Sequence, residues 1–279
     1  MKRLPLVFIG IIAVAGLVYF VLPFSLNVSG SLLAGNFLPG NQTVKEVVLD
    51  DFFFYNCEEG ILHFDTLTYG GNQSDLYLVN ITTGTGTLKQ SHVGNWKDTL
   101  AVDRNRRLFT IGKDSLGNEH LVQLNPDGSN RFVGPTNTSD KISQLAFGPD
   151  RKLYAMGNQA NGLYRINVNR GKATLLHSFT LIPASSGDIA IDGNNLMLFL
   201  RNNGEIYTMD LNNFSTEALA GTLPQGGRVY TGVVFKNGTY YGNTQNGVIH
   251  EFTLGPLRSA VVTGSGGQFM VGDAGNCPG

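Results

Sequence analysis

A short pattern of apolar and polar residues recurs five times along the chain. In each copy an aliphatic residue comes first, an apolar residue follows three positions later, and a short polar residue comes directly after it. Successive copies begin 45, 42, 43 and 43 residues apart. A strand-like unit with a period in the forties indicates a repeat architecture in which each repeat forms one small sheet. The copies are residues 76–80, 121–125, 163–167, 206–210 and 249–253.

Further strand-like segments surround each copy. One precedes it by about ten residues, and turns rich in Asn and Gly separate the two, as in β-hairpins. An outer apolar segment follows each copy. Four antiparallel strands per repeat is the blade of a β-propeller, with the recurring pattern as its third strand. The predicted second strands are 62–64, 108–111, 153–156, 196–199 and 239–241, and the outer strands are 87–89, 131–133, 173–176, 218–220 and 260–262.

The innermost strand of a blade lies in crowded surroundings, and a column of small residues marks it here. Ala101, Ala146, Ala190 and Gly232 occupy this column. Within the clear repeats there are only four such strands, against five of every other kind. The predicted inner strands are 99–103, 144–148, 188–192 and 231–235.

The missing inner strand is expected at the C-terminus. Residues 269–273 fit the column, and a C-terminal strand that completes the first blade removes two exposed sheet edges. Residues 46–55 are also strand-like and are the alternative. We favour the C-terminal strand because Asp273 matches Asp103 and Asp192, which end their own inner strands. The predicted fold is all-β: a five-bladed β-propeller closed by a C-terminal inner strand and preceded by one N-terminal hydrophobic helix.

The two cysteines flank this proposed closure. Cys57 comes shortly before the first second strand, and Cys277 comes shortly after the C-terminal inner strand. No tight turn joins these two strands, so a disulfide between Cys57 and Cys277 would replace the covalent connection of the other blades. An oxidising, extracytoplasmic compartment permits such a bond.

The N-terminus predicts a location outside the cytoplasm. Lys2 and Arg3 precede an uncharged apolar run of 21 residues from Leu4 to Phe24, which is long enough to span a bilayer as a helix. We interpret it as a signal anchor, with a cleaved signal peptide as the alternative. The predicted organisation is therefore an anchor or signal peptide at 1–24, a linker or stalk at 25–45, and the propeller at 46–279.

Composition argues against nucleic acid as a partner, and the sequence offers sites for covalent glycans. The formal net charge is −1, so there is no basic excess for nucleic acid. Only 15% of residues are charged and 36 are Gly, which suits short strands joined by many turns. Asn-x-Ser/Thr sequons can carry glycans outside the cytoplasm. The glycosylation candidates are Asn27, Asn41, Asn72, Asn80, Asn137, Asn213 and Asn237.

The repeats resemble those of bacterial-type β-propeller repeat proteins, a group of unassigned function. The resemblance rests on an inner Leu-Ala segment, then Leu-Tyr, then Leu-Tyr-x-Ile-Asn, then Ala-Thr-Leu. It is clearest over residues 141–178 and covers roughly residues 50–279. It implies a propeller fold and a secreted or surface location, and it implies no particular activity.

Catalytic chemistry has few candidates. Five-bladed propellers include glycoside hydrolases, whose chemistry needs two carboxylates about 5–9.5 Å apart. Asp98 and Asp188 are the pair that would serve such an alternative function, with Asp273 as a further axial carboxylate. The five histidines are scattered without ligand spacing, so we expect neither a metal site nor a cofactor. These histidines are His63, His92, His120, His177 and His250.

The predicted function is non-catalytic binding of a glycan or protein by an extracytoplasmic, membrane-anchored propeller. The sole Trp and several polar residues stand at the starts of inner strands and would surround the mouth of the channel. A glycan-active hydrolase and a structural subunit of a surface filament, envelope or virion are the alternatives. The predicted ligand-binding residues are Trp96, Asp98, Ser143, Asp188, Tyr230 and Gln268.

Overall fold

The chain divides into two compact units in the computed structural model, Met1–Leu49 and Asp50–Gly279. Several predictions fall outside the residues described: the linker at 25–45, the alternative strand at 46–55, both cysteines, three binding residues and three sequons. The binding residues are Trp96, Asp98 and Gln268, and the sequons are those at Asn27, Asn41 and Asn72. The structure describes residues 11–14, 17–20, 60–65, 73–94, 99–183, 186–224, 226, 229–262 and 272–275.

The first unit contains two strands where the sequence predicts a helix. β1 (Ile11–Val14) pairs antiparallel with β2 (Leu17–Phe20), with Ile11 opposite Phe20 and Val14 opposite Leu17. β-branched and aromatic residues favour strands, and two residues are enough for a hairpin connection. The predicted helix is therefore wrong for these residues. In the part of the chain that is described, no helix is long and apolar enough to cross a membrane.

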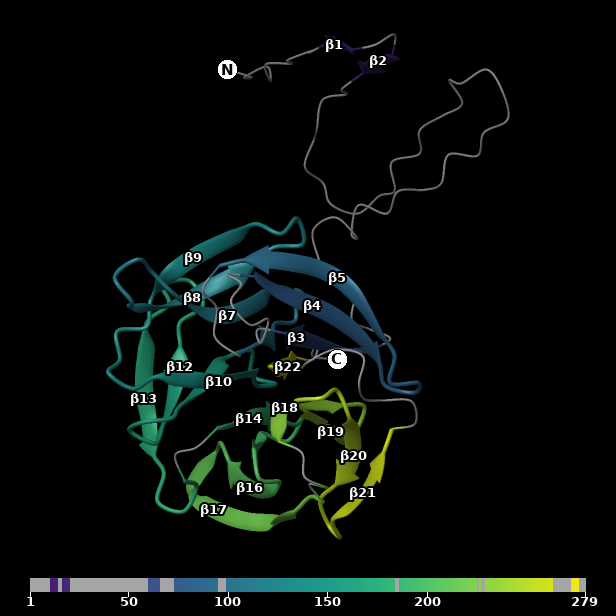
Figure 1. Cartoon of the computed structure of the whole chain (residues 1–279). Coiled ribbons are helices and arrows are strands. Elements are labelled where there is room, and N and C mark those ends of the chain that lie inside the picture. Colours follow the sequence, from purple (N-terminus) through teal and green to yellow (C-terminus); the bar gives the residue numbers. More distant parts are fainter. Residues whose placement is uncertain are drawn as a thin grey trace, which may run out of the picture. The chain divides into compact units, whose positions relative to one another are not determined.

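The second unit contains five four-stranded antiparallel sheets among its described residues (Figure 1). Four of them are simple meanders, and the fifth takes its innermost strand from the C-terminus. Their strands are β6 (Ala101–Val102), β7 (Leu108–Lys113), β8 (Glu119–Leu124) and β9 (Asn130–Pro135); β10 (Ile142–Phe147), β11 (Leu153–Gly157), β12 (Gly162–Ile166) and β13 (Ala173–Ser178); β14 (Gly187–Ile191), β15 (Leu196–Arg201), β16 (Glu205–Asp210) and β17 (Asn213–Thr222); β18 (Tyr230–Lys236), β19 (Thr239–Thr244), β20 (Ile249–Thr253) and β21 (Arg258–Val261); and β22 (Asp273–Gly275), β3 (Gly60–Asp65), β4 (Gln73–Asn80) and β5 (Gly86–Val93).

The sheets surround a common centre in the arrangement of a β-propeller. β10, β14, β18 and β22 are innermost in Figure 1, and β6 contacts both β10 and β22. Each inner strand thus contacts the inner strand of the next sheet, and the series returns to its start. Every predicted second, third and outer strand overlaps a strand of the structure, which confirms the strand assignment.

The C-terminal strand completes the first sheet, as the sequence predicts. β22 pairs with β3, with Asp273 opposite Phe64 and Gly275 opposite Leu62. One detail of the prediction is wrong, because Asp273 begins the described strand and does not end it. The match of Asp273 to Asp103 and Asp192 therefore does not hold.

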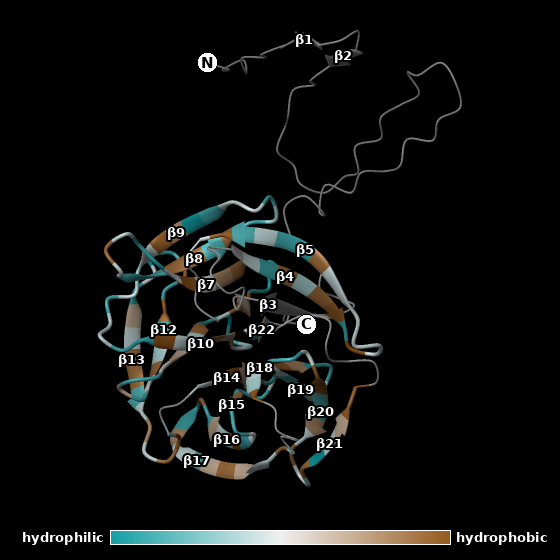
Figure 2. Ribbon diagram, in the orientation of Figure 1, coloured by the Kyte–Doolittle hydropathy of each residue, from teal (hydrophilic) through white to brown (hydrophobic). Residues whose placement is uncertain are grey.

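The hydrophobic core lies between neighbouring sheets. One cluster joins β7 and β8 to β10–β12, and Phe109 is fully buried in it. Another joins β11 and β12 to β14–β16 around Phe199. Burying one Phe side chain stabilises the fold by roughly 1.5–3 kcal/mol. Hydrophilic and hydrophobic residues both occur along the outer strands β9, β13 and β17 (Figure 2), which fits a surface that is partly open to solvent.

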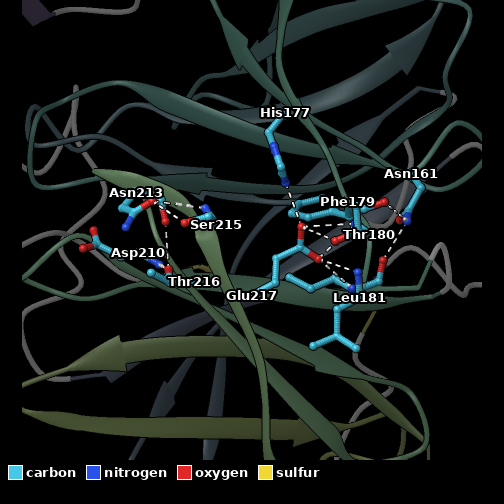
Figure 3. A network of polar contacts seen from close by, with 11 residues as sticks. Asn161, His177, Phe179, Thr180, Leu181, Asp210, Asn213, Ser215, Thr216 and Glu217 are labelled. Carbon is cyan, nitrogen blue, oxygen red and sulfur yellow. Dashed lines mark hydrogen bonds and ion pairs between the residues drawn. The ribbon is translucent and has the colours of Figure 1, made fainter.

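A buried carboxylate joins two of the sheets near their outer edges. Glu217 on β17 accepts hydrogen bonds from His177 Nε2 (2.7 Å) and from the backbone N–H groups of Thr180, Leu181 and Ile182 (Figure 3). Burial alone would raise the pKa of Glu217, but these hydrogen bonds outweigh it and lower the pKa to about 2. The carboxylate therefore fixes the segment that follows β13.

Candidate functional site

Three of the predicted binding residues belong to the described part of the chain. Tyr230 is only 1% exposed, its hydroxyl donates to the carbonyl of Pro224 (2.9 Å), and its ring packs edge-on against His250. The structure therefore places Tyr230 in the core and not on an open mouth. Ser143 lies at an irregularity of β10, between Ile142 and Gln144, and its hydroxyl has no hydrogen-bond partner among the described residues.

Asp188 belongs to a polar layer that the five inner segments share. In four sheets the inner-strand residue of this layer lies opposite a residue of the second strand. That second-strand residue lies opposite the first residue of the recurring pattern, on the third strand. In the remaining sheet Thr99 accepts a hydrogen bond from Ile111 N–H, and Ile111 pairs with Leu121. We name this set the axial layer, and it consists of Thr99, Gln144, Asp188, Gly232 and Asp273.

The two acidic residues of the axial layer tie the sheets together. Asp188 accepts hydrogen bonds from Ile189 N–H (2.7 Å) and, in the next sheet, from Val233 N–H (2.7 Å). Asp273 accepts one from Leu100 N–H, just before β6. The two carboxyl groups are also hydrogen-bonded to each other. A Cβ on Gly232 would lie 2.8 Å from Ala274, so glycine permits this close approach.

Burial raises the pKa of both acids. The pKa of Asp188 rises from its ordinary value of 3.8 to about 7 because the carboxylate is removed from water. Burial, and then the charge of Asp188, raise the pKa of Asp273 well above its ordinary value. Two carboxyl groups in contact cannot both ionise cheaply, so the pair shares a proton at neutral pH.

This geometry suits a structural tie better than glycoside hydrolysis. Both side chains are about 1% exposed, so a sugar has no route to them in this conformation. The partner of Asp188 in the described residues is Asp273, whereas the predicted catalytic partner was Asp98. Hydrogen-bonded carboxyl groups also leave no room for the sugar that must lie between them in a glycosidase.

A more accessible site is a polar hollow of about 630 Å³ at the edge of the sheet that contains β7 and β8. The turn that joins β7 to β8 forms one wall, and the connection from β9 to β10 forms the other. In an antiparallel meander this is the end of the sheets where β10 and β14 begin, and therefore the end that carries the predicted mouth. We define the polar hollow by its lining residues Lys113, Asp114, Gly117, Asn118, Glu119, His120 and Pro135–Lys141.

Asp114 orders the first wall. Its Oδ1 atom accepts the N–H groups of Leu116 and Asn118 (2.9 Å each), and its Oδ2 atom accepts hydrogen bonds from Asn118 Nδ2 (3.0 Å) and His120 Nε2 (3.1 Å). The Asn118 side chain is the main cause that lowers the pKa of Asp114 to about 2, with backbone N–H groups and His120 also contributing. The turn therefore keeps a permanent negative charge beside the hollow.

Asp140 and Glu119 order the second wall. Asp140 is 2% exposed, and its Oδ1 atom accepts the N–H groups of Gln159 and Ala160 (2.9 Å each). Glu119 accepts the N–H of Ile142 (3.1 Å) across the gap between the sheets. The walls are thus held in place before any ligand arrives, which lowers the entropic cost of binding.

The sequence analysis missed the polar hollow. Its signals were the turn Asp-Ser-Leu-Gly-Asn at 114–118 and the polar run at 136–141. Either one resembles an ordinary loop, and only the fold brings them together. Asn137, a predicted glycosylation site, lies in this lining and is exposed. Asn80, Asn213 and Asn237 are also exposed. Among the described residues, no group of three or more His, Cys, Asp or Glu could hold a metal ion.

The fold and its ring of inner strands define the class: this is an all-β protein of the β-propeller type. No protein-family model matches the chain, and no curated protein matches its sequence. The comparison with solved structures supports the class.

Three solved structures illustrate that similarity, each sharing the fold alone. A chain of a nidogen/laminin complex has 11% identity and a TM-score of 0.53, with 80% of this chain and 82% of that chain covered. A structural genomics protein of unknown function from Bacteroides thetaiotaomicron has 13% identity and a TM-score of 0.50, covering 70% and 56%. An auxiliary nutrient binding protein from Bacteroides ovatus has 12% identity and a TM-score of 0.50, covering 75% and 57%.

Proposed function

We propose that this protein is a non-catalytic, five-bladed propeller that binds a glycan at the polar hollow. The observation that carries the proposal is the hollow itself, about 630 Å³ in volume and lined by amide, hydroxyl and charged groups of the β7–β8 hairpin and of the connection from β9 to β10. This volume falls in the usual range for small-ligand sites, roughly 300–1,000 Å³. Each four-stranded sheet would be one blade, and the contacts between successive inner strands support that count.

The lining favours a hydroxyl-rich ligand. Asn118, Asn137, Thr138 and Ser139 offer both donors and acceptors, which a sugar can pair with from either side. Lys113 and Lys141 are balanced by acidic residues of the same lining, so the hollow has no strong preference for one sign of charge. A neutral or zwitterionic glycan is therefore the best fit.

The test is a glycan array probed with the purified full chain, followed by calorimetry on any sugar that binds. Asn137→Gly keeps the left-handed backbone at this position (φ 54°) and removes the side-chain amide. Together with Lys141→Ala it is expected to weaken sugar binding at least about tenfold, the equivalent of one or two lost hydrogen bonds. Unchanged affinity in this double variant, or a protein partner in place of every sugar, contradicts the proposal.

Two controls sharpen the result. The wild-type chain produced in the bacterial cytoplasm, where the sequon at Asn137 receives no N-linked glycan, separates a covalent glycan at this residue from a bound one. Lys172→Ala removes one exposed positive charge outside the hollow. Binding that survives both controls and fails in the double variant locates the sugar in the polar hollow.

The location outside the cytoplasm also belongs to the proposal. Its support is the apolar run from Leu4 to Phe24 behind Lys2 and Arg3, together with the sequons whose asparagines are exposed. Fractionation of cells that express the full chain, with protease applied to intact cells, tests it. Protection of the propeller from external protease would show a cytoplasmic location.

A further inference from the structure

Positive charge gathers in two neighbouring turns at the other end of the sheets. One turn joins β6 to β7 over residues 103–107, and the other joins β10 to β11 over residues 148–152. Together they carry five of the 20 Lys and Arg residues of the chain and only two acids. In a meander these turns lie opposite the β7–β8 turn, so they are remote from the polar hollow.

A hollow of about 300 Å³ lies between these two turns, and we name it the arginine hollow. Arg104, Arg107 and Arg151 line it, together with the apolar side chains of Phe147 and Val168. Asp103 is its one acidic lining residue. A small cavity with an apolar wall and several guanidinium groups is suited to a ring that bears an anionic group.

The acids of the two turns are already engaged. Asp103 forms an ion pair with Arg107 (2.6 Å) and accepts the N–H groups of Asn105 (2.9 Å) and Arg107 (2.8 Å). In the second turn Asp150 pairs with Lys152 (2.7 Å). The acids therefore neutralise Arg107 and Lys152 and leave the remaining lining arginines without a counter-charge.

Arg104 and Arg151 are those remaining arginines. Arg104 makes one long hydrogen bond from Nη2 to the carbonyl of Pro149 (3.4 Å). The side chain of Arg151 has no ion pair or hydrogen bond among the described residues, and the residue is exposed. Two guanidinium groups without carboxylate partners thus border one small cavity.

The backbone of Arg151 identifies a matched variant. Its φ of 66° lies in the left-handed region, where Asn or Gly is preferred and a long side chain costs free energy. The corresponding turn between β14 and β15 has the same hydrogen bonds and places Asn195 there, with a φ of 65°. The turn between β6 and β7 also has these hydrogen bonds and places Arg106 there, with a φ of 59°, although Arg106 does not line the arginine hollow. The left-handed backbone therefore does not by itself mark a binding residue, and Asn is a replacement for Arg151 that this turn position accommodates.

We propose that the arginine hollow is a second binding site, which takes a sugar-sized ligand bearing an oxyanion group. Arg104 and Arg151 would donate charge-assisted hydrogen bonds to the oxyanion, and Phe147 with Val168 would contact the apolar face of the ring. A carboxylate, a sulfate and a phosphate share this chemistry. The site is independent of the glycan site proposed at the polar hollow.

The experiment is calorimetric titration of the full-length Asn137→Gly, Lys141→Ala variant, in which the polar hollow is impaired, with glucuronate, glucose 6-sulfate and glucose 6-phosphate. Glucose is the neutral probe. The charged sugars are expected to bind and glucose is not, and their affinity is expected to fall between about 50 mM and about 500 mM salt because ions screen the arginines. The order of the three affinities identifies the preferred oxyanion. Equal binding of glucose, or no binding of any charged sugar, overturns the proposal.

The matched variant is Arg151→Asn, because the turn between β14 and β15 has Asn195 at the same position. We expect it to fold with an unchanged or higher melting temperature and to bind the charged sugars at least about tenfold more weakly. Arg104→Gln is expected to have a similar effect, and Lys89→Gln, an exposed residue on β5, is the control for loss of one positive charge. Wild-type affinity in Arg151→Asn and Arg104→Gln, or the same loss in Lys89→Gln, overturns the assignment.

Discussion

At the scale of single residues, the axial layer shows that one register position can have different roles in different sheets. Asp188 and Asp273 occupy the same position in their sheets and meet each other, whereas Gly232 between them has no side chain. Each acid accepts one hydrogen bond from an N–H group of a neighbouring sheet, Asp188 from Val233 and Asp273 from Leu100. Specific pairing of inner strands thus depends on buried polar groups as well as on apolar packing.

Replacing Asp188 by Asn is expected to reduce the dependence of stability on pH. The folded-state pKa of Asp188, about 7, exceeds its ordinary value of 3.8, so folding is linked to proton uptake between these values. The free energy of unfolding of the wild type should therefore rise as pH falls from about 7 towards 4. The amide of the variant keeps an acceptor for Val233 N–H without any charge. Urea unfolding between about pH 4.5 and pH 8 measures the difference, and equal slopes in both proteins would contradict it.

Replacing Glu217 by Gln is expected to lower the free energy of unfolding by about 1–3 kcal/mol. The amide that replaces one oxygen would turn its N–H groups towards the N–H donors of Thr180, Leu181 or Ile182. Chemical denaturation at neutral pH measures the loss.

The exposed Glu251 on β20 provides the matched control, because Glu251→Gln is expected to change stability by less than about 0.5 kcal/mol. A loss of the same size in both variants would mean that the Glu217 contacts contribute nothing specific.

At the scale of elements, alternation and repeat spacing were enough to predict the strands, because each strand has one buried face and a turn at each end. The recurring pattern predicts β4, β8, β12, β16 and β20 from two apolar positions and one polar position in each of its five copies. The register of β22 could not be predicted in the same way, since no turn connects it to β3. The polar hollow also escaped prediction, because Asp114 and Asp140 lie in separate connections between strands and neither stands in a known motif.

A chain that ends at Val271 is expected to lose cooperative folding. It lacks β22, so the edge of β3 is unpaired and Leu100 N–H loses the carboxylate of Asp273. A chain that ends at Gly275 keeps the strand and is the control, and neither version has Cys277. Denaturation under reducing conditions compares them. An equally sharp and equally stable transition in the shorter chain would show that the ring does not depend on β22.

At the scale of the whole molecule, the predicted disulfide between Cys57 and Cys277 concerns residues outside those described. Gly275 and Leu62, which are close in sequence to Cys277 and Cys57, lie opposite each other in the pairing of β22 with β3. A bond that closes a loop of about 220 residues would stabilise the fold by roughly 5 kcal/mol in the chain-entropy model. Peptide mass mapping with and without reductant tests it. Two alkylated thiols in protein folded under oxidising conditions would contradict the bond.

The pairing of β22 with β3 also determines when this molecule can finish folding. β3 leaves the ribosome early, but its partner lies roughly 210 residues further along the chain. At about 5–20 residues per second, that delay is on the order of 10–40 s. During translation the first sheet must wait with an open edge while the other sheets form. A chain exported while unfolded would avoid this interval in the cytoplasm, and a chain retained there would need a chaperone to cover that edge.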